Sequence, residues 1–189
     1  MEAGEAAAVL ARARQGDGEA FRALVEIHAR GAFGLAFRLT GDERDAEDVV
    51  QESFIRAYRQ LGGFEARSNF GTWLHRIVVN CAMDALRARH ARREERGLDP
   101  EAAVFETLPS VGPSPERLAR SAEIRRRVDA SMGTLTPQER VAFALRHYEG
   151  RSIDDIGRTL GVQKSAAKHA VFRAVRKIRA ALEPLRRAT

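Results

Sequence analysis

The chain has 189 residues, of which 44% are hydrophobic and 31% charged, and its formal net charge is +6. This composition is that of a globular protein and excludes a disordered chain, and no apolar run approaches the roughly 20 residues that a membrane-spanning helix needs. The single cysteine, Cys81, excludes an internal disulfide. The first residues show no secretory pattern, so we expect a cytoplasmic protein without membrane insertion.

The N-terminal half has the periodicity of amphipathic helices. A first helical region is predicted from Glu5 to Leu39, with an interruption near Gly16–Gly18. A second is predicted from Ala46 to Leu61, and a third begins near Ser68. Together they predict one small helical domain over residues 5–93.

The second of these helices begins in an acidic stretch, DAEDVVQE. On a helical wheel, the face opposite the apolar stripe carries Asp48, Gln51, Glu52, Ile55 and Arg59. Acids at a helix start are favoured by the helix dipole, but the dipole accounts neither for an exposed isoleucine nor for polar residues beyond the first turn. A protein partner with a basic surface accounts for both, so this face is predicted to dock a protein.

Residues 94–120 differ from both sides of the chain. They contain four of the six prolines and lack sustained periodicity. We interpret this stretch as a flexible linker, with an ordered loop packed on one domain as the alternative.

A second helical domain is predicted over residues 121–185. Residues 135–189 hold 12 Lys and Arg against 5 Asp and Glu, a net charge of +7. Thr136, Pro137 and Glu139 fit a capping box at a helix start. The run SIDDIGRTL, the turn GVQ and the run KSAAKHAVFRAV have helix-turn-helix spacing, with Gly161 in a left-handed conformation.

The second helix of this motif is predicted to turn a cationic face outward. That face carries Lys164, Ser165, Lys168, His169, Phe172, Arg173, Arg176 and Lys177. Such a face suits the major groove of DNA, because phosphates supply affinity and polar side chains read base edges. The alternative is a solvated face on a structural helix, but the turn spacing and the local charge favour DNA.

Two blocks of the sequence resemble a known family. The run DAEDVVQESFIRAYRQLGGFE, followed by SNFGTWLHRIVVNCAMDALRARHARR, resembles region 2 of the sigma-70 family, in its extracytoplasmic-function (group 4) subgroup. The run from Leu135 to Arg179 resembles region 4. The resemblance implies an all-α fold of two small domains. It also implies a transcription initiation factor that binds core RNA polymerase, recognises the −35 and −10 promoter elements and assists melting.

The resemblance also implies roles for single residues. Asp48, Gln51, Glu52 and Ile55 would bind the core enzyme, through the clamp helices of its beta-prime subunit, with the beta subunit as a further contact. The −10 element would meet Arg76, Asn80, Asp84 and Arg87, and the loop Phe64–Phe70 would capture an unstacked base. The −35 element would meet Lys164, Ser165, Lys168, His169, Arg173 and Arg176. An anti-sigma factor is a further candidate partner.

The sequence departs from the family pattern at the start of the recognition helix. Ala166, Ala167, His169 and Ala170 replace more usual residues, and Ala170 stands where an arginine is common, so the usual set of −35 contacts is not assured. No catalytic residue, metal or cofactor is expected, since neither a glycine-rich phosphate loop nor a metal-ligand spacing is present. A free-standing helix-turn-helix regulator and an all-helical enzyme are the competing hypotheses.

Overall fold

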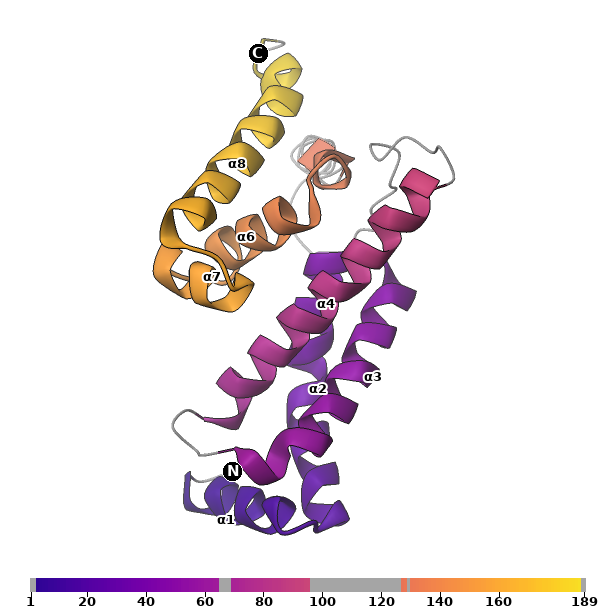
Figure 1. The fold of residues 1–189 in the computed structure, drawn as a ribbon, viewed down its shortest axis with the longest axis vertical. Coiled ribbons are helices and arrows are strands. Elements are labelled where there is room, and N and C mark those ends of the chain that lie inside the picture. Colours follow the sequence, from indigo (N-terminus) through magenta and orange to yellow (C-terminus); the bar gives the residue numbers. More distant parts are fainter. Residues whose placement is uncertain (1–2, 65–68, 96–126, 129, 188–189) are drawn as a thin grey trace, which may run out of the picture. The chain divides into compact units, whose positions relative to one another are not determined.

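The computed structural model describes residues 3–64, 69–95, 127–128 and 130–187, and all regular structure in these ranges is helical. The elements are α1 (Ala3–Arg14), α2 (Gly18–Thr40), α3 (Glu43–Gln60), the short 3₁₀ helix η1 (Leu61–Gly63), α4 (Phe70–Glu95), α6 (Pro137–His147), α7 (Ile153–Leu160) and α8 (Lys164–Arg187) (Figure 1). The predicted all-α class is confirmed.

The chain divides into two compact units. The N-terminal unit comprises Met1–Thr40 and Arg44–Ala82, and the C-terminal unit comprises Gly41–Glu43 and Met83–Thr189. Almost all of the predicted linker, residues 94–120, lies outside the described residues; residues 94 and 95 end α4. The domain bounds drawn from the sequence therefore stay a prediction.

The predicted interruption of the first helical region separates α1 from α2. Gly16 adopts a φ of 91°, a conformation that glycine tolerates best. Asp17 then starts the next helix, because its Oδ1 accepts a hydrogen bond from the Ala20 N–H at 3.0 Å. Arg12 anchors the same carboxylate at 2.6 Å, so the corner between the two helices is fixed by side chains.

The core of the N-terminal unit lies among α2, α3 and the first part of α4, which run alongside one another (Figure 1). Its buried apolar side chains include Leu24, Leu35, Leu39, Val49, Phe54, Leu74 and Val78. Tyr58 has the helical spacing of the buried residues of α3, yet it is 52% exposed. Tyr58 lies near the end of α3, where its ring meets Phe21 edge-on at 5.0 Å between centroids.

The C-terminal unit is built by α6 and α7 packing on α8 (Figure 1). Thr136 and Glu139 form the predicted capping box of α6, and Ser152 caps α7 by accepting the Asp155 N–H at 3.1 Å. Gly161 ends α7 with a φ of 65°, as predicted. A side chain at Gly157 would place a Cβ 3.0 Å from the carbonyl oxygen of Val162, so glycine here permits a close helix-turn-helix.

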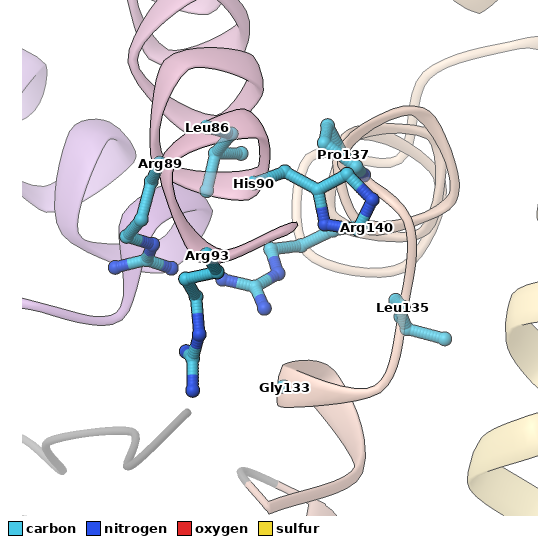
Figure 2. A pocket seen from close by; sticks show the side chains of 8 residues that line it. All are labelled: Leu86, Arg89, His90, Arg93, Gly133, Leu135, Pro137 and Arg140. Atoms are coloured by element: carbon cyan, nitrogen blue, oxygen red, sulfur yellow. The ribbon is translucent and has the colours of Figure 1, made fainter. Parts of the chain in front are cut away.

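Most buried side chains of α8 are small. Ala167, Ala170 and Ala174 have at most trace exposure, and Ile178 joins Met132 and Leu135 in one apolar cluster. Small residues bring helix axes close together, which fixes the helices tightly. Arg140, which lines the pocket of Figure 2 with Leu135 and Pro137, reinforces this packing, since its Nη2 donates to the carbonyl oxygen of Met132 at 2.6 Å.

Candidate functional site

The first candidate surface is the α3 face, defined as Asp48, Gln51, Glu52 and Ile55. Asp48 and Gln51 are exposed, Ile55 is 38% exposed, and Glu52 is half-buried beside Arg56, whose Nε lies 2.6 Å from its carboxylate. In the part of the chain that the structure describes, the side chains of Asp48 and Gln51 make no hydrogen bond or ion pair. An apolar side chain ringed by available polar groups is typical of a protein interface.

The opposite side of α3 holds the helix in place. Val49, Phe54 and Ala57 are buried there, and Ser53 is buried with its hydroxyl donating to the carbonyl oxygen of Val49 at 2.6 Å. The rotation of α3 is thus set by its apolar stripe, as the wheel predicts. The four predicted residues therefore share one outward surface.

The second candidate surface is the α4 face, defined as Arg76, Asn80, Asp84 and Arg87. All four side chains are exposed, and their spacing of four, four and three residues puts them on one side of α4. Asp84 and Arg87 lie 3.9 Å apart as an ion pair. The last turns of the same helix add Arg89, His90 and Arg93 (Figure 2), and the helix ends with Glu94 and Glu95.

The loop predicted to capture an unstacked base falls partly outside the described residues, which omit 65–68. Its two ends, Phe64 and Phe70, are buried, and both rings lie against Trp73, with centroids 4.9 and 5.7 Å away. Asn69, just before α4, is not among the residues predicted from the sequence. Its Oδ1 accepts the Thr72 N–H at 2.7 Å and caps α4, an Asn-x-x-Thr signal that the helix-start rules could have found.

The third candidate surface is the α8 face, defined as Lys164, Ser165, Lys168, His169, Arg173 and Arg176. All six are exposed, and Phe172, 64% exposed, lies among them. Ala170 is fully buried on the other side of α8, together with Ala167. Two of the unusual residues at the helix start therefore belong to the packing of α8 and not to its exposed surface.

The cations of α8 fall into two classes. Lys164 Nζ lies 2.8 Å from Asp154 of α7, and Arg173 Nε lies 2.8 Å from Glu139 of α6. Lys177 also reaches Glu139, at 2.9 Å. Lys168 and Arg176 have no ion pair within the described ranges. Part of the basic charge is thus neutralised inside the domain, and part is available to a partner.

Glu139 is the charged centre of this arrangement, and its side chain is 3% exposed. Burial on its own raises the pKa of Glu139, but hydrogen bonds from Lys177, Arg173 and the Thr136 N–H outweigh it and hold the pKa below its ordinary value of 4.5. From the sequence, Glu139 is predicted only as a member of the capping box. Its partners lie 34 and 38 residues away, beyond any local spacing rule.

Among the described residues, no group of three or more His, Cys, Asp or Glu side chains is arranged to hold a metal ion. No helix in the same ranges is long and apolar enough to cross a membrane.

Comparison with known families and proteins gives consistent matches. Residues 24–92 match sigma-70 region 2, and residues 125–178 match sigma-70 region 4. The chain is 37% identical over 180 residues to the RNA polymerase sigma-H factor of Pseudomonas aeruginosa, covering 93% of each chain. It is 35% identical over 182 residues to the ECF RNA polymerase sigma-E factor of Haemophilus influenzae, covering 94% of this chain and 95% of that one.

Two solved structures share the fold. CnrH, in complex with the cytosolic domain of CnrY, aligns with a TM-score of 0.58 and 28% identity, over 93% of this chain and 96% of that one. The sigma factor RpoE of Bartonella quintana, in complex with the anti-sigma factor NepR, aligns with a TM-score of 0.64 and 21% identity, over 86% and 96% of the two chains.

Proposed function

The chain belongs to the sigma-70 family, in its extracytoplasmic-function (ECF) subfamily, and on that premise we propose that its α3 face binds core RNA polymerase while its α4 and α8 faces bind promoter DNA. The protein is a transcription initiation factor that directs RNA polymerase to promoters. The proposal concerns which side chains do this.

The observation that carries the proposal is the separation of charge between exposed helical faces. The α3 face presents Asp48 and Glu52 around the apolar Ile55, whereas the α8 face presents Lys168 and Arg176. Opposite charges steer a protein toward different partners: an acidic face toward a basic protein surface, and a basic face toward phosphates. We assign the α3 face to the clamp helices of the beta-prime subunit and the α8 face to the −35 element.

The α4 face is assigned to the −10 element. Arg76 and Asn80 carry the donors and acceptors that read exposed base edges, and the arginines in the last turns of α4 can follow the phosphate backbone. Unstacking a base costs a few kcal/mol, so a protein surface that holds the extruded base assists strand opening. We propose that the loop Phe64–Phe70, of which residues 65–68 lie outside the described ranges, captures that base.

The remaining partners follow from the same premise. We propose that the chain carries no catalytic group of its own, because the polymerase performs the chemistry, and that it works in the cytoplasm beside that enzyme. The beta subunit is proposed as a second contact on the core. An anti-sigma factor is proposed as a regulatory partner, with support from the CnrH structure, in which another protein's domain is bound.

Transcription in vitro tests the function directly. Core polymerase is incubated with a genomic promoter library, with and without the chain, and transcript starts are sequenced. We expect new starts only when the chain is present, downstream of one shared pair of −35 and −10 sequences. Footprinting provides the contrary outcome: equal protection of promoter DNA with and without core polymerase would identify a free-standing regulator and reject the proposal.

A further inference from the structure

Glu139 connects the start of α6 to the DNA-facing side of α8. Its Oε1 accepts a hydrogen bond from Arg173 Nε at 2.8 Å, and its Oε2 accepts from Lys177 Nζ at 2.9 Å. The Thr136 N–H donates to the same Oε2 at 3.2 Å, which completes the capping box. A capping box asks only this last contact of the Glu139 carboxylate, with the Glu139 N–H donating to Thr136 Oγ1 as its other half, so the two cations are additional to the helix cap.

The carboxylate holds its two cations in different ways. Lys177 is 38% exposed, and its Nζ also donates to the carbonyl oxygen of Thr134 at 3.3 Å, so the charge of this lysine is directed into the domain. Arg173 is 46% exposed and uses only Nε. Its two terminal nitrogens have no partner among the described residues.

The shape of the guanidinium group makes this difference matter. Because the group is planar and rigid, a bond at Nε fixes the orientation of the whole plane. The edge that bears the two terminal nitrogens can then make a bidentate contact with a guanine or a phosphate. An ammonium group has no second edge of donors. The contact with Glu139 therefore keeps Lys177 inside the domain, whereas it orients Arg173 outward.

We propose that Glu139 is a positioning residue for promoter recognition, which orients Arg173 toward the −35 element and keeps Lys177 away from DNA. The inference rests on the proposed function of the α8 face. Neutralising Glu139 then has two opposite consequences. Sequence discrimination falls because Arg173 loses its orientation, and non-specific attraction rises because Lys177 becomes available to phosphate.

The experiment uses holoenzyme reconstituted from core polymerase and the full chain, and promoter DNA that the wild-type holoenzyme selects from a random library. Binding is measured across salt concentration and against every single-base variant of the −35 element. Glu139→Gln is the main variant, since glutamine also fits a capping box, while the change removes the negative charge and one of the two acceptor oxygens. Three further variants complete the set: Arg173→Ala, Glu139→Gln combined with Arg173→Ala, and Glu139→Gln combined with Lys177→Gln.

We expect Glu139→Gln to lower base preference roughly tenfold at one −35 position, the same position that Arg173→Ala affects. The double variant with Arg173→Ala should lose no further preference, because both changes remove one interaction. The slope of log K against log salt should steepen by about 0.9, the value for one added phosphate contact. Adding Lys177→Gln should abolish that steepening.

Other outcomes overturn the inference. A purely structural Glu139 would weaken binding to every −35 variant equally and leave the salt slope unchanged or shallower. If Glu139→Gln does not fold, the single variant Lys177→Gln tests the inference. Replacing a lysine that is held away from DNA leaves the salt slope unchanged, whereas replacing a lysine that binds phosphate makes the slope shallower.

Two reference variants separate this inference from the function of the face. Lys168→Ala is expected to make the slope shallower, and an unchanged slope there would reject DNA binding by the α8 face itself. If the slope is shallower both for Lys168→Ala and for Lys177→Gln, the role of Glu139 is rejected, and DNA binding by the α8 face is retained. Arg179→Gln removes an exposed cation of α8 outside the α8 face and should leave the slope unchanged.

Discussion

The α3 face and the α8 face are both exposed and charged, but they are built into the molecule differently. Glu52 on α3 pairs with Arg56 of its own helix, and Asp48 has no partner in the described residues. On α8, Lys164 and Arg173 are tied to α7 and α6 by ion pairs. Changes on the α3 face should therefore alter binding alone, whereas some changes on the α8 face alter binding and folding together.

The difference fits the demands of the two proposed partners. Charged groups on a protein interface act largely through long-range steering and complementarity, which tolerate adaptable side chains. Reading DNA bases requires hydrogen bonds of fixed geometry, since phosphate contacts carry no direct sequence information. A side chain held by Glu139 or Asp154 has less freedom to lose on binding.

The largest effect is expected on the α3 face. Reversing the charge with Asp48→Lys, together with Gln51→Ala, should weaken binding to core polymerase by about 2 kcal/mol, roughly thirtyfold, because a like charge replaces a complementary one. Free energy of unfolding should change by less than about 0.5 kcal/mol, as is usual for exposed sites. Competition against a labelled sigma factor measures the affinity, and urea unfolding measures the stability.

The control for this variant is Glu26→Lys, a charge reversal at an exposed acid of α2. It should leave core affinity near that of the wild type. Core binding unchanged in the α3 variant would show that polymerase docks elsewhere. Equal losses in both variants would show that net charge matters and the α3 face does not.

The two faces also differ in how far the sequence predicts them. Periodicity places Asp48 and Lys168 on the correct sides of their helices because buried stripes fix helix rotation. Local signals also predict Thr136 as a cap and Gly161 as a left-handed turn. These features depend on neighbours a few residues away, so a single sequence contains the information.

What the sequence does not predict depends on packing between distant segments. The meeting of Glu139 with Arg173 requires α6 to lie against α8, and no local spacing encodes it. Tyr58 matches the apolar stripe in spacing, yet it lies near the end of α3, where it is exposed beside the ring of Phe21. Ala170 looked like a change in the recognition surface and is a packing residue.

A second prediction extends the comparison to α4. Asn80→Ala removes an exposed amide that has no partner in the described ranges, so the fold should be unaffected. Loss of hydrogen bonds to one base should lower preference for the −10 element roughly tenfold, with −35 preference unchanged. Holoenzyme binding to single-base promoter variants measures both preferences.

Gln60→Ala, at an exposed position that ends α3, is the matched control for Asn80→Ala. It should leave both preferences intact. A wild-type −10 profile in Asn80→Ala would remove this residue from the proposed α4 face.

A third prediction concerns the pH dependence of the free energy of unfolding, to which Glu139 beneath the α8 face should contribute and the α3 face should not. Glu139 has a folded pKa below its ordinary value of 4.5, so its carboxylate stabilises the fold above that pH and the contribution is lost as pH falls through the folded pKa. The wild type should therefore lose stability below about pH 4.5, and Glu139→Gln should lack this part of the loss. Urea unfolding at several pH values measures both.

Thr136→Ala and Asp48→Lys are the controls for the pH experiment. Thr136→Ala removes the helix cap and should cost about 1 kcal/mol at neutral pH, with the acid loss retained. Asp48→Lys should follow the wild-type profile, since the α3 face contributes little to folding. An identical acid profile in wild type and Glu139→Gln would contradict the assignment of this titration to Glu139.

The smallest effect is expected inside the α8 face, where paired and unpaired cations can be compared directly. Lys168→Ala should make the salt slope of promoter binding shallower by about 0.9. The loss of affinity between roughly 50 and 200 mM salt is then about threefold smaller than in the wild type. Lys164→Ala should change the slope less, because Asp154 already neutralises Lys164 at 2.8 Å and this lysine therefore has less of a phosphate contact to lose. Equal changes in slope for the two lysines would mean that DNA binding breaks the Lys164–Asp154 pair. The contrast between a fixed and an adaptable charged face would then hold in the free protein but not in the promoter complex.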